Sequence, residues 1–192
     1  YNNRSIANIS AIPGAAKSLT HIKTITASNA STTSFVNGSS DVVFDNTYPI
    51  YLVELINIHN DTSDKYLQFN FSADTGSNYN VTKTTSAFNA YHKEDGSASA
   101  LQYEASVDLA QGTGAQRLTA GQHNASDAAH SGTILIFNPS STTFVKHFMS
   151  DISTIGYDGS NEYNYHMFIA GHCNTTSAVD AFQFSINSGT HD

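Results

Sequence analysis

The only cysteine of the chain, Cys173, is the residue whose type could act as a nucleophile, and a histidine directly precedes it. A thiolate nucleophile needs a base whose ring reaches the sulfur atom. Cys173 and His172 are neighbours at the end of an apolar run, so on a strand their side chains would point to opposite faces. No other histidine is indicated by its spacing. We therefore do not predict a catalytic cysteine, and a single cysteine excludes a disulfide within the chain.

Nine histidines could supply metal ligands, but their spacing does not favour a site within one chain. Zinc ligands usually come in short pairs such as His-x-His. The closest repeat, His166 with His172, would span about 20 Å of strand, and we expect Gly171 to interrupt it. A trimer axis could gather three copies of one histidine, such as His147 or His166. We predict no metal and no cofactor, and an inter-subunit histidine site stays open.

The carboxylates show no paired arrangement in the sequence. Glu54 lies in an otherwise apolar strand face, which predicts a buried acid with a structural partner. A glycosidase would need two carboxylates that face each other, and nothing in the spacing selects Glu104 or Glu162 as the second. The acidic loops at residues 41–45 and 61–64 lack the ordered aspartate pattern of a calcium loop and indicate solvated turns.

Any site would have to be positioned by strands, and residues 132–149 carry the strongest strand signal. Residues 132–137 and 142–149 are rich in Ile, Phe, Thr and Val, and Asn138-Pro139 between them favours a turn. They predict an antiparallel hairpin. The first run is apolar on both faces, which is typical of a strand covered on both sides. We therefore place this hairpin inside a sheet.

The rest of the chain predicts further strands. A second hairpin is expected from residues 48–59 and 66–71, joined across residues 60–64, with Leu67, Phe69 and Phe71 facing inward. Residues 117–130 are polar and expected to be exposed, and residues 101–116 fit either irregular structure or one short helix. Additional strands are expected at residues 18–27, 35–36, 42–44, 81–92, 166–170 and 179–186.

About eight to ten strands with polar connections and no long helix predict an all-β fold. We expect a two-sheet antiparallel β-sandwich, jelly-roll-like, for residues 18–192, with residues 1–17 as an N-terminal arm or connector. The chain begins at Tyr1, so we expect a processed start or a piece of a longer protein.

Composition argues against two classes of partner. Of the 192 residues only 12% are charged, the net charge is −8, and no basic run occurs, which argues against nucleic-acid binding. No run of 18 apolar residues indicates membrane insertion, and the Gly-Thr-Gly run at residues 112–114 is too short for a phosphate loop. A polar, uncharged exterior is common outside cells or on particles, so we expect an extracellular location.

Three segments together resemble the poorly characterised β-rich virion proteins of marine bacteriophages, including cyanophages. They are YLVELINIH at residues 51–59, YHKED at residues 91–95 with DLAQGTG at residues 108–114, and FNPSSTTFVKH at residues 137–147. The likeness covers residues 18–188 and rests on fold-type motifs. The family has no established active site, so no functional residue is carried over. Its members run on to a further strand, so either the likeness ends early or that strand is missing here.

The resemblance implies a structural protein of the phage particle: a tail fibre, an appendage or a capsid decoration. We expect it on the virion surface, as a homo-oligomer with a trimer favoured, beside other virion proteins and with a part in host attachment. The chain is not expected to be an enzyme. The alternative is a lectin-like carbohydrate-binding β-sandwich that takes a host-surface glycan.

Overall fold

The computed structural model of the protein describes residues 19–192, so the arm or connector predicted for residues 1–17 lies outside the described residues. The described chain is all-β, as the sequence predicts, and contains no helix. Its strands are β1 (Thr32–Val36), β2 (Ile50–Ile58), β3 (Leu67–Ser72), β4 (Lys83–Lys93), β5 (Ser99–Tyr103), β6 (Gln116–Arg117), β7 (His130–Phe137), β8 (His147–Tyr157), β9 (Glu162–Cys173) and β10 (Ala181–Ile186).

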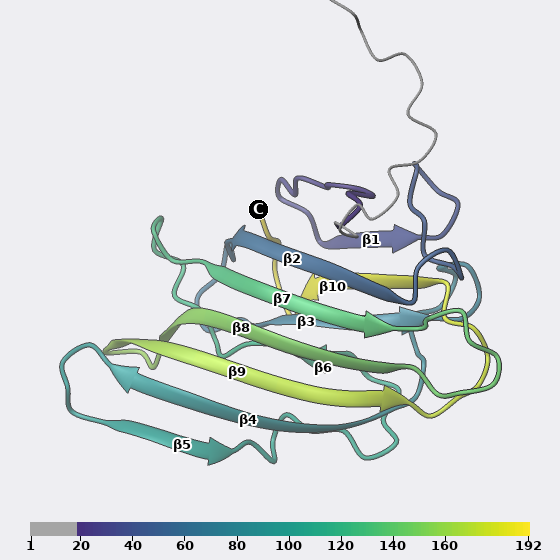
Figure 1. Ribbon diagram of the computed structural model, residues 1–192. Coiled ribbons are helices and arrows are strands. Elements are labelled where there is room, and N and C mark those ends of the chain that lie inside the picture. The colour runs from purple at the N-terminus through teal and green to yellow at the C-terminus, as the bar shows by residue number, and fades with distance from the viewer. Residues whose placement is uncertain (1–18) are drawn as a thin grey trace, which may run out of the picture.

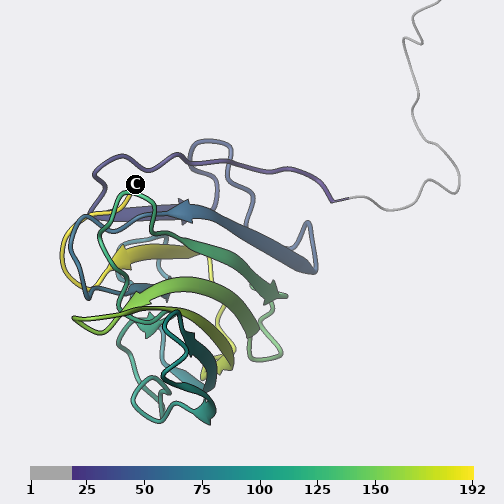
Figure 2. The ribbon, with the colours of Figure 1, turned by 90° about the vertical axis from the view of Figure 1, so that its left-hand side faces the viewer.

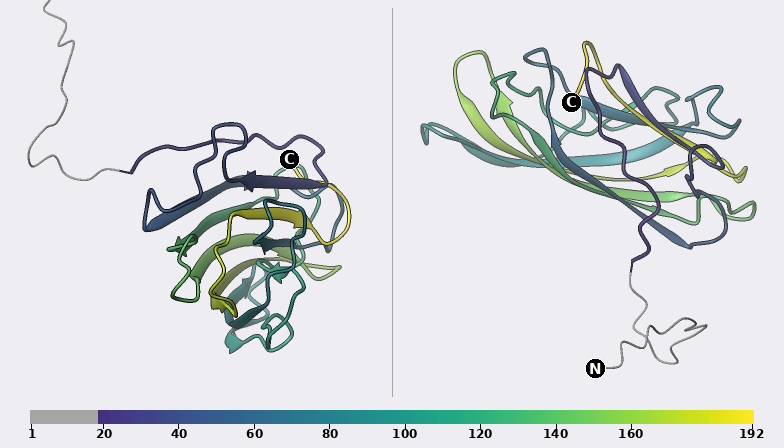
Figure 3. Two further views of the ribbon diagram at one scale, coloured as in Figure 1. Left: turned by 90° about the vertical axis from the view of Figure 1, so that its right-hand side faces the viewer. Right: turned by 90° about the horizontal axis from the view of Figure 1, so that it is seen from above.

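The strands form two antiparallel sheets packed face to face, which confirms the predicted β-sandwich. One sheet has the order β1-β10-β3-β6, and the other has the order β2-β7-β8-β9-β4-β5. Figure 1 shows the six-stranded sheet in front and the four-stranded sheet behind it. The same two layers are visible from the side (Figure 2) and from above (Figure 3).

The strands pair in the order of a jelly roll, except that three strands stand in the place of one. β1 pairs with β10, β2 with β7, β3 with β6 and β4 with β5, so the two halves of the chain pair in nested order. Successive pairs alternate between the two sheets, as in the eight-stranded jelly roll. The strand that would join β2 to β4 in that fold is replaced by the three-strand meander β7-β8-β9, which widens the front sheet to six strands.

The core lies between the sheets and is rich in aromatic rings. Alternation along β3 buries Leu67, Phe69 and Phe71, as predicted, and each is at most 1% exposed. Phe148 of β8 meets Phe69 and Phe71 edge to face, with ring centroids 5.2 and 5.5 Å apart. Edge-to-face contacts of this kind add to the free energy gained by burying the rings.

The predicted hairpin at residues 132–149 is confirmed in place but not in its second strand. β7 and β8 pair antiparallel and lie inside the six-stranded sheet. Residues 142–146, predicted to begin the second strand, belong instead to the connection, and Lys146 within it is 1% exposed. β8 starts at His147 and continues to Tyr157, well beyond the predicted end.

The predicted second hairpin is wrong, because β2 and β3 belong to different sheets. The same sequence pattern, two strand-like runs joined by a polar loop, occurs in a hairpin and in a connection that passes from one sheet to the other. The crossing loop is tied to the C-terminal residues instead, since the backbone N–H of Asp61 donates to the carbonyl of Thr190 at 3.1 Å.

Further differences concern weakly patterned segments. Residues 19–27 and 42–44 form no strand, although Val42 and Phe44 are buried in the core. Residues 101–116 contain the end of β5, a long connection and the start of β6, with no helix. Residues 117–130 are not uniformly exposed, because Leu118 and Gln122 are 0% exposed. Across residues 19–192 the structure contains no helix of the length and apolarity that crossing a membrane requires.

Candidate interaction surface on the six-stranded sheet

The side of the six-stranded sheet that faces away from the four-stranded sheet, called here the outer face, carries a large share of apolar side chains. Strand alternation places Leu135 and Phe137 of β7 on it, while Ile134 and Ile136 are buried at 1% exposure. The outer face is the side toward the viewer in Figure 1.

The first apolar cluster of the outer face lies on β2, β7 and β8. Strand register sets Ile50 opposite Phe137, and it sets Leu52 opposite Leu135 and Leu135 opposite Met149. Ile50 and Met149 are each 53% exposed. Cross-strand neighbours in register contact each other, so these side chains form one continuous apolar surface.

A second apolar cluster lies on β9, β4 and β5. Phe168 of β9 is opposite Phe88 of β4, and the two rings stack with centroids 4.9 Å apart. Phe88 is in turn opposite Tyr103, and Leu101 beside them is 74% exposed. Phe88 is 47% and Tyr103 57% exposed, so this cluster adds a second apolar surface to the outer face.

Between the clusters lies an open depression. Its lining includes the small side chains of Ser86 and Ala170 and the rings of Phe137, His147 and His172. The depression has a volume of about 560 Å³, which is within the usual range for small-molecule sites. Its lining combines aromatic and polar side chains.

Histidines flank the depression in an arrangement that the sequence did not predict. His147 of β8 lies opposite His172 of β9, with ring centroids 5.8 Å apart. Gly171 does not interrupt β9, contrary to the prediction, so His166 and His172 both lie on the outer face. His166 contacts the carboxylate of Asp151 on β8. Among residues 19–192, no group of three or more His, Cys, Asp or Glu side chains is placed to hold a metal ion.

Cys173 is buried in the core at 0% exposure, while His172 lies on the outer face. Burial raises the pKa of the Cys173 thiol to about 12. The thiol is therefore protonated at neutral pH, and it has neither the charge nor the access that a nucleophile needs.

The prediction that Glu54 is buried is wrong. Glu54 lies on the exposed side of β2 because Tyr51 and Leu55 turn inward instead. Glu104 follows β5 at the opposite edge of the same sheet, where it accepts hydrogen bonds from Asn89 at 3.0 Å and from Ser106 at 2.5 Å. The structure therefore does not bring these two carboxylates together.

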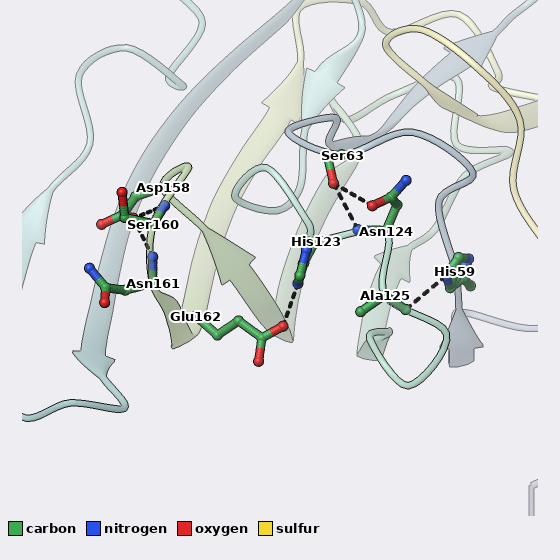
Figure 4. A network of polar contacts seen from close by, with 9 residues as sticks. All are labelled: His59, Ser63, His123, Asn124, Ala125, Asp158, Ser160, Asn161 and Glu162. Atoms are coloured by element: carbon green, nitrogen blue, oxygen red, sulfur yellow. Dashed lines mark hydrogen bonds and ion pairs between the residues drawn. The ribbon is translucent and has the colours of Figure 1, made fainter.

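Glu162 belongs to a polar network at one end of the sandwich (Figure 4). It contacts Nδ1 of His123, whose ring stacks on Tyr157 with centroids 4.1 Å apart. In the same network, Ser63 donates to Asn124 at 2.6 Å, and a ring nitrogen of His59 lies 3.1 Å from the carbonyl oxygen of Ala125. These contacts tie loops together.

The acidic loops also have structural partners. The carboxylate of Asp61 accepts hydrogen bonds of 3.0 Å from the backbone and the hydroxyl of Thr190, and the backbone bond is the main cause that lowers the pKa of Asp61. Asp45 accepts a bond of 2.8 Å from the backbone of Thr47, and hydrogen bonds from Thr47 likewise lower the pKa of Asp45. The Gly-Thr-Gly run lies beside the start of β4, where Gly112 and Lys83 exchange backbone hydrogen bonds.

The outer face thus carries exposed apolar side chains that make no contact with the other sheet. It also carries a shallow depression lined by aromatic and imidazole rings. No protein-family model, no curated protein and no solved structure matches the chain.

Proposed function

We propose that the chain is a structural protein of a marine phage particle, part of a tail fibre, an appendage or a capsid decoration. In this proposal, copies of the chain pack against one another through the outer face of the six-stranded sheet. The resemblance of three segments to β-rich virion proteins supports the class of protein, and the jelly-roll sandwich is an architecture that viral shell proteins use. The resemblance favours a trimer.

The observation that carries the proposal is the two-sided apolar pattern of β7. A strand that is apolar on both faces is normally covered on both, but the described chain covers only the side of Ile134 and Ile136. Leu135 and Phe137 are left half-buried on the other side. Large exposed apolar surfaces on folded proteins usually mark contacts with other molecules, and a second copy would complete the cover.

The charges on this face fit a second copy of the same chain. Among residues 19–192, no lysine or arginine side chain lies on the outer face. Its acidic residues include Asp151, which already contacts His166, and Glu54, which lies on β2 at the edge of the sheet. Two such faces can meet without burying a lone cation. Because buried unpaired charges are costly, a surface with few charges suits self-association through apolar contact.

The mass of the protein in solution tests the proposal. We expect the full chain at micromolar concentration to have a multiple of the 20.6 kDa of one chain in analytical ultracentrifugation. Met149→Glu should shift the protein toward the monomer, because it places a carboxylate in the first apolar cluster. The matched control is Gln183→Glu, which adds the same charge on the outside of the four-stranded sheet.

A wild-type mass equal to one chain would contradict the proposal, as would equal effects of the two substitutions. Membership of the particle is tested separately. Peptides of this chain should be found by mass spectrometry in purified virions at a stoichiometry of many copies, and their absence would remove the virion part of the proposal.

A second candidate function is binding of a host-surface glycan, and the depression beside Phe137 favours it. Sugars bind to aromatic rings combined with polar side chains, and His147, His172 and Thr84 supply polar groups around Ser86 and Ala170. A glycan array of the wild type and of His172→Ala tests this function. Binding that is lost in the variant supports it, and an array at background level contradicts it.

A further inference from the structure

Lys83, the first residue of β4, is fully buried without an acidic partner. It is 0% exposed, and its Nζ contacts Oδ1 of Asn70 and donates a hydrogen bond of 2.8 Å to the carbonyl oxygen of Val81. In the part of the chain that the structure describes, no carboxylate forms an ion pair with it. A buried ammonium without a counter-charge is costly.

The surroundings of Lys83 therefore raise the fraction of its amine that is neutral. Cys173 lies opposite it on β9, and burial raises the pKa of that thiol to about 12, so it supplies no negative charge. Burial also lowers the pKa of Lys83 to about 8. A neutral lysine amine, unlike the ammonium, has a lone pair and is a nucleophile.

The carboxamide of Asn70 is held in place beside this amine. Asn70 lies on β3 and is 7% exposed. Its Nδ2 donates to the carbonyl oxygens of Tyr79 at 2.6 Å and Thr113 at 3.0 Å, and its Oδ1 accepts the backbone N–H of Phe71 at 2.9 Å. An N–H that already points at Oδ1 would stabilise negative charge that develops there.

We propose that the folded protein joins Lys83 to Asn70 by an intramolecular amide bond. Nζ attacks Cγ of Asn70 and forms the new C–N bond, while negative charge builds on Oδ1 beside the Phe71 N–H. One proton passes from Nζ to Nδ2, the bond between Cγ and Nδ2 breaks, and ammonia leaves with that electron pair. One amide replaces another, so no oxidant or reductant takes part, and fixed neighbours supply the proximity.

The second buried lysine of the sandwich shows what is special about Lys83. Lys146 is 1% exposed, and its Nζ donates to the carbonyl oxygens of Phe144 at 3.3 Å and Thr175 at 3.2 Å. Both are backbone carbonyls, and neither carries a carboxamide that could release ammonia. Lys146 is therefore a buried lysine of ordinary type and an internal control.

The proposed bond would join the two layers of the sandwich. β3 belongs to the four-stranded sheet and β4 to the six-stranded sheet, and the joined residues are 13 apart in sequence. A crosslink of this kind limits the unfolded chain in the way a disulfide does, in a protein that has no disulfide. A particle component outside a cell would benefit from that stability.

Intact-protein mass spectrometry of the folded wild-type chain, after a day at 37 °C, tests the proposal. We expect a mass about 17 Da below the sequence mass, the loss of one ammonia. After denaturation, trypsin should cut after Lys65 and Lys93 but not after Lys83, while cleavage after Lys146 should be normal. A chymotryptic cut at Tyr79 should leave the two pieces joined.

Two variants separate this bond from an ammonia loss elsewhere, such as at Asn37-Gly38. Lys83→Met should restore the full calculated mass, and Lys146→Met should keep the deficit. A wild-type mass equal to the sequence mass, free cleavage after Lys83, or a deficit that persists in Lys83→Met would each overturn the proposal. The wild-type measurement needs no variant to fold, so a misfolded variant does not hide the answer.

Discussion

The two faces of the six-stranded sheet are built from the same strands and are both apolar, yet only one is covered within the chain. On the inner face, Ile134, Phe148 and Ile152 are at most 1% exposed. On the outer face, Met149 is 53% exposed and its neighbours Leu135 and Phe137 are half-buried. Apolar character alone therefore does not tell which side of a strand holds the fold together. The difference separates residues needed for folding from residues available for contact with another molecule.

Truncation of an inner-face ring should have the largest effect. Phe148→Ala removes the edge-to-face contacts with Phe69 and Phe71, and we expect a loss of about 3–5 kcal/mol in the free energy of unfolding. Urea denaturation monitored by far-UV circular dichroism measures this loss, since the chain has no tryptophan for fluorescence. The control is Met149→Ala, the next residue along β8 but on the outer face. Equal losses in the two variants would contradict the assignment of the two faces.

A histidine on the inner face should make stability depend on pH. His130 is 0% exposed, and burial is the main cause that lowers its pKa to about 3. Nδ1 lies 2.9 Å from the hydroxyl of Thr154, and Nε2 has no hydrogen-bond partner, so a second proton would be buried without an acceptor. Below the unfolded pKa, near 6.5, only the unfolded chain takes up the proton.

The folded protein therefore loses stability as the pH falls. The contribution of neutral His130 is fully present above about pH 6.5 and is lost as the pH falls toward 3, by about 2 kcal/mol at pH 5. Burial also lowers the pKa of His191, which adds a loss of the same sign. Urea denaturation at pH 7 and pH 5 should show a smaller difference in His130→Gln than in the wild type. An unchanged difference would show that His130 does not cause the loss.

Substitution on the outer face should have the smallest effect on the monomer. Leu52→Ser removes an apolar side chain that is 36% exposed, and we expect the free energy of unfolding of the monomer to fall by only about 1 kcal/mol. The same variant should weaken self-association. Denaturation at a concentration where the chain is monomeric, compared with ultracentrifugation at a high one, separates the two effects. A large loss of monomer stability would mean that the chain itself covers this face.

The parts of the fold that sequence predicts best are those with a clear period. Alternation along β3 and β10 correctly predicts the inward-facing residues, because successive side chains of a strand point to opposite faces and the more apolar face is buried. These residues are Phe69, Phe71, Phe182 and Phe184. The interior position of β7 is likewise predicted by its apolar character. The class of fold follows from these strands and their number.

The errors occur where a decision depends on residues far away in the chain. Glu54 shares its strand face with Ile50 and Leu52, so the pattern suggests burial, but the core takes the side of Tyr51 and Leu55. Whether β2 and β3 pair or cross between sheets is also not a local property. Both runs satisfy the same pattern, and the nested pairing of the whole jelly roll decides between them.

The sequence by itself determined that this protein is all-β, that its strands bury one face each, and that its single cysteine forms no internal disulfide, because these follow from residue type and short-range period. Only the tertiary structure decided which of two apolar faces is covered, that His147 lies opposite His172, and that Lys83 reaches Asn70. Those facts depend on register and on how the two sheets are stacked. Both are set by the summed packing of many distant side chains, which no local pattern contains.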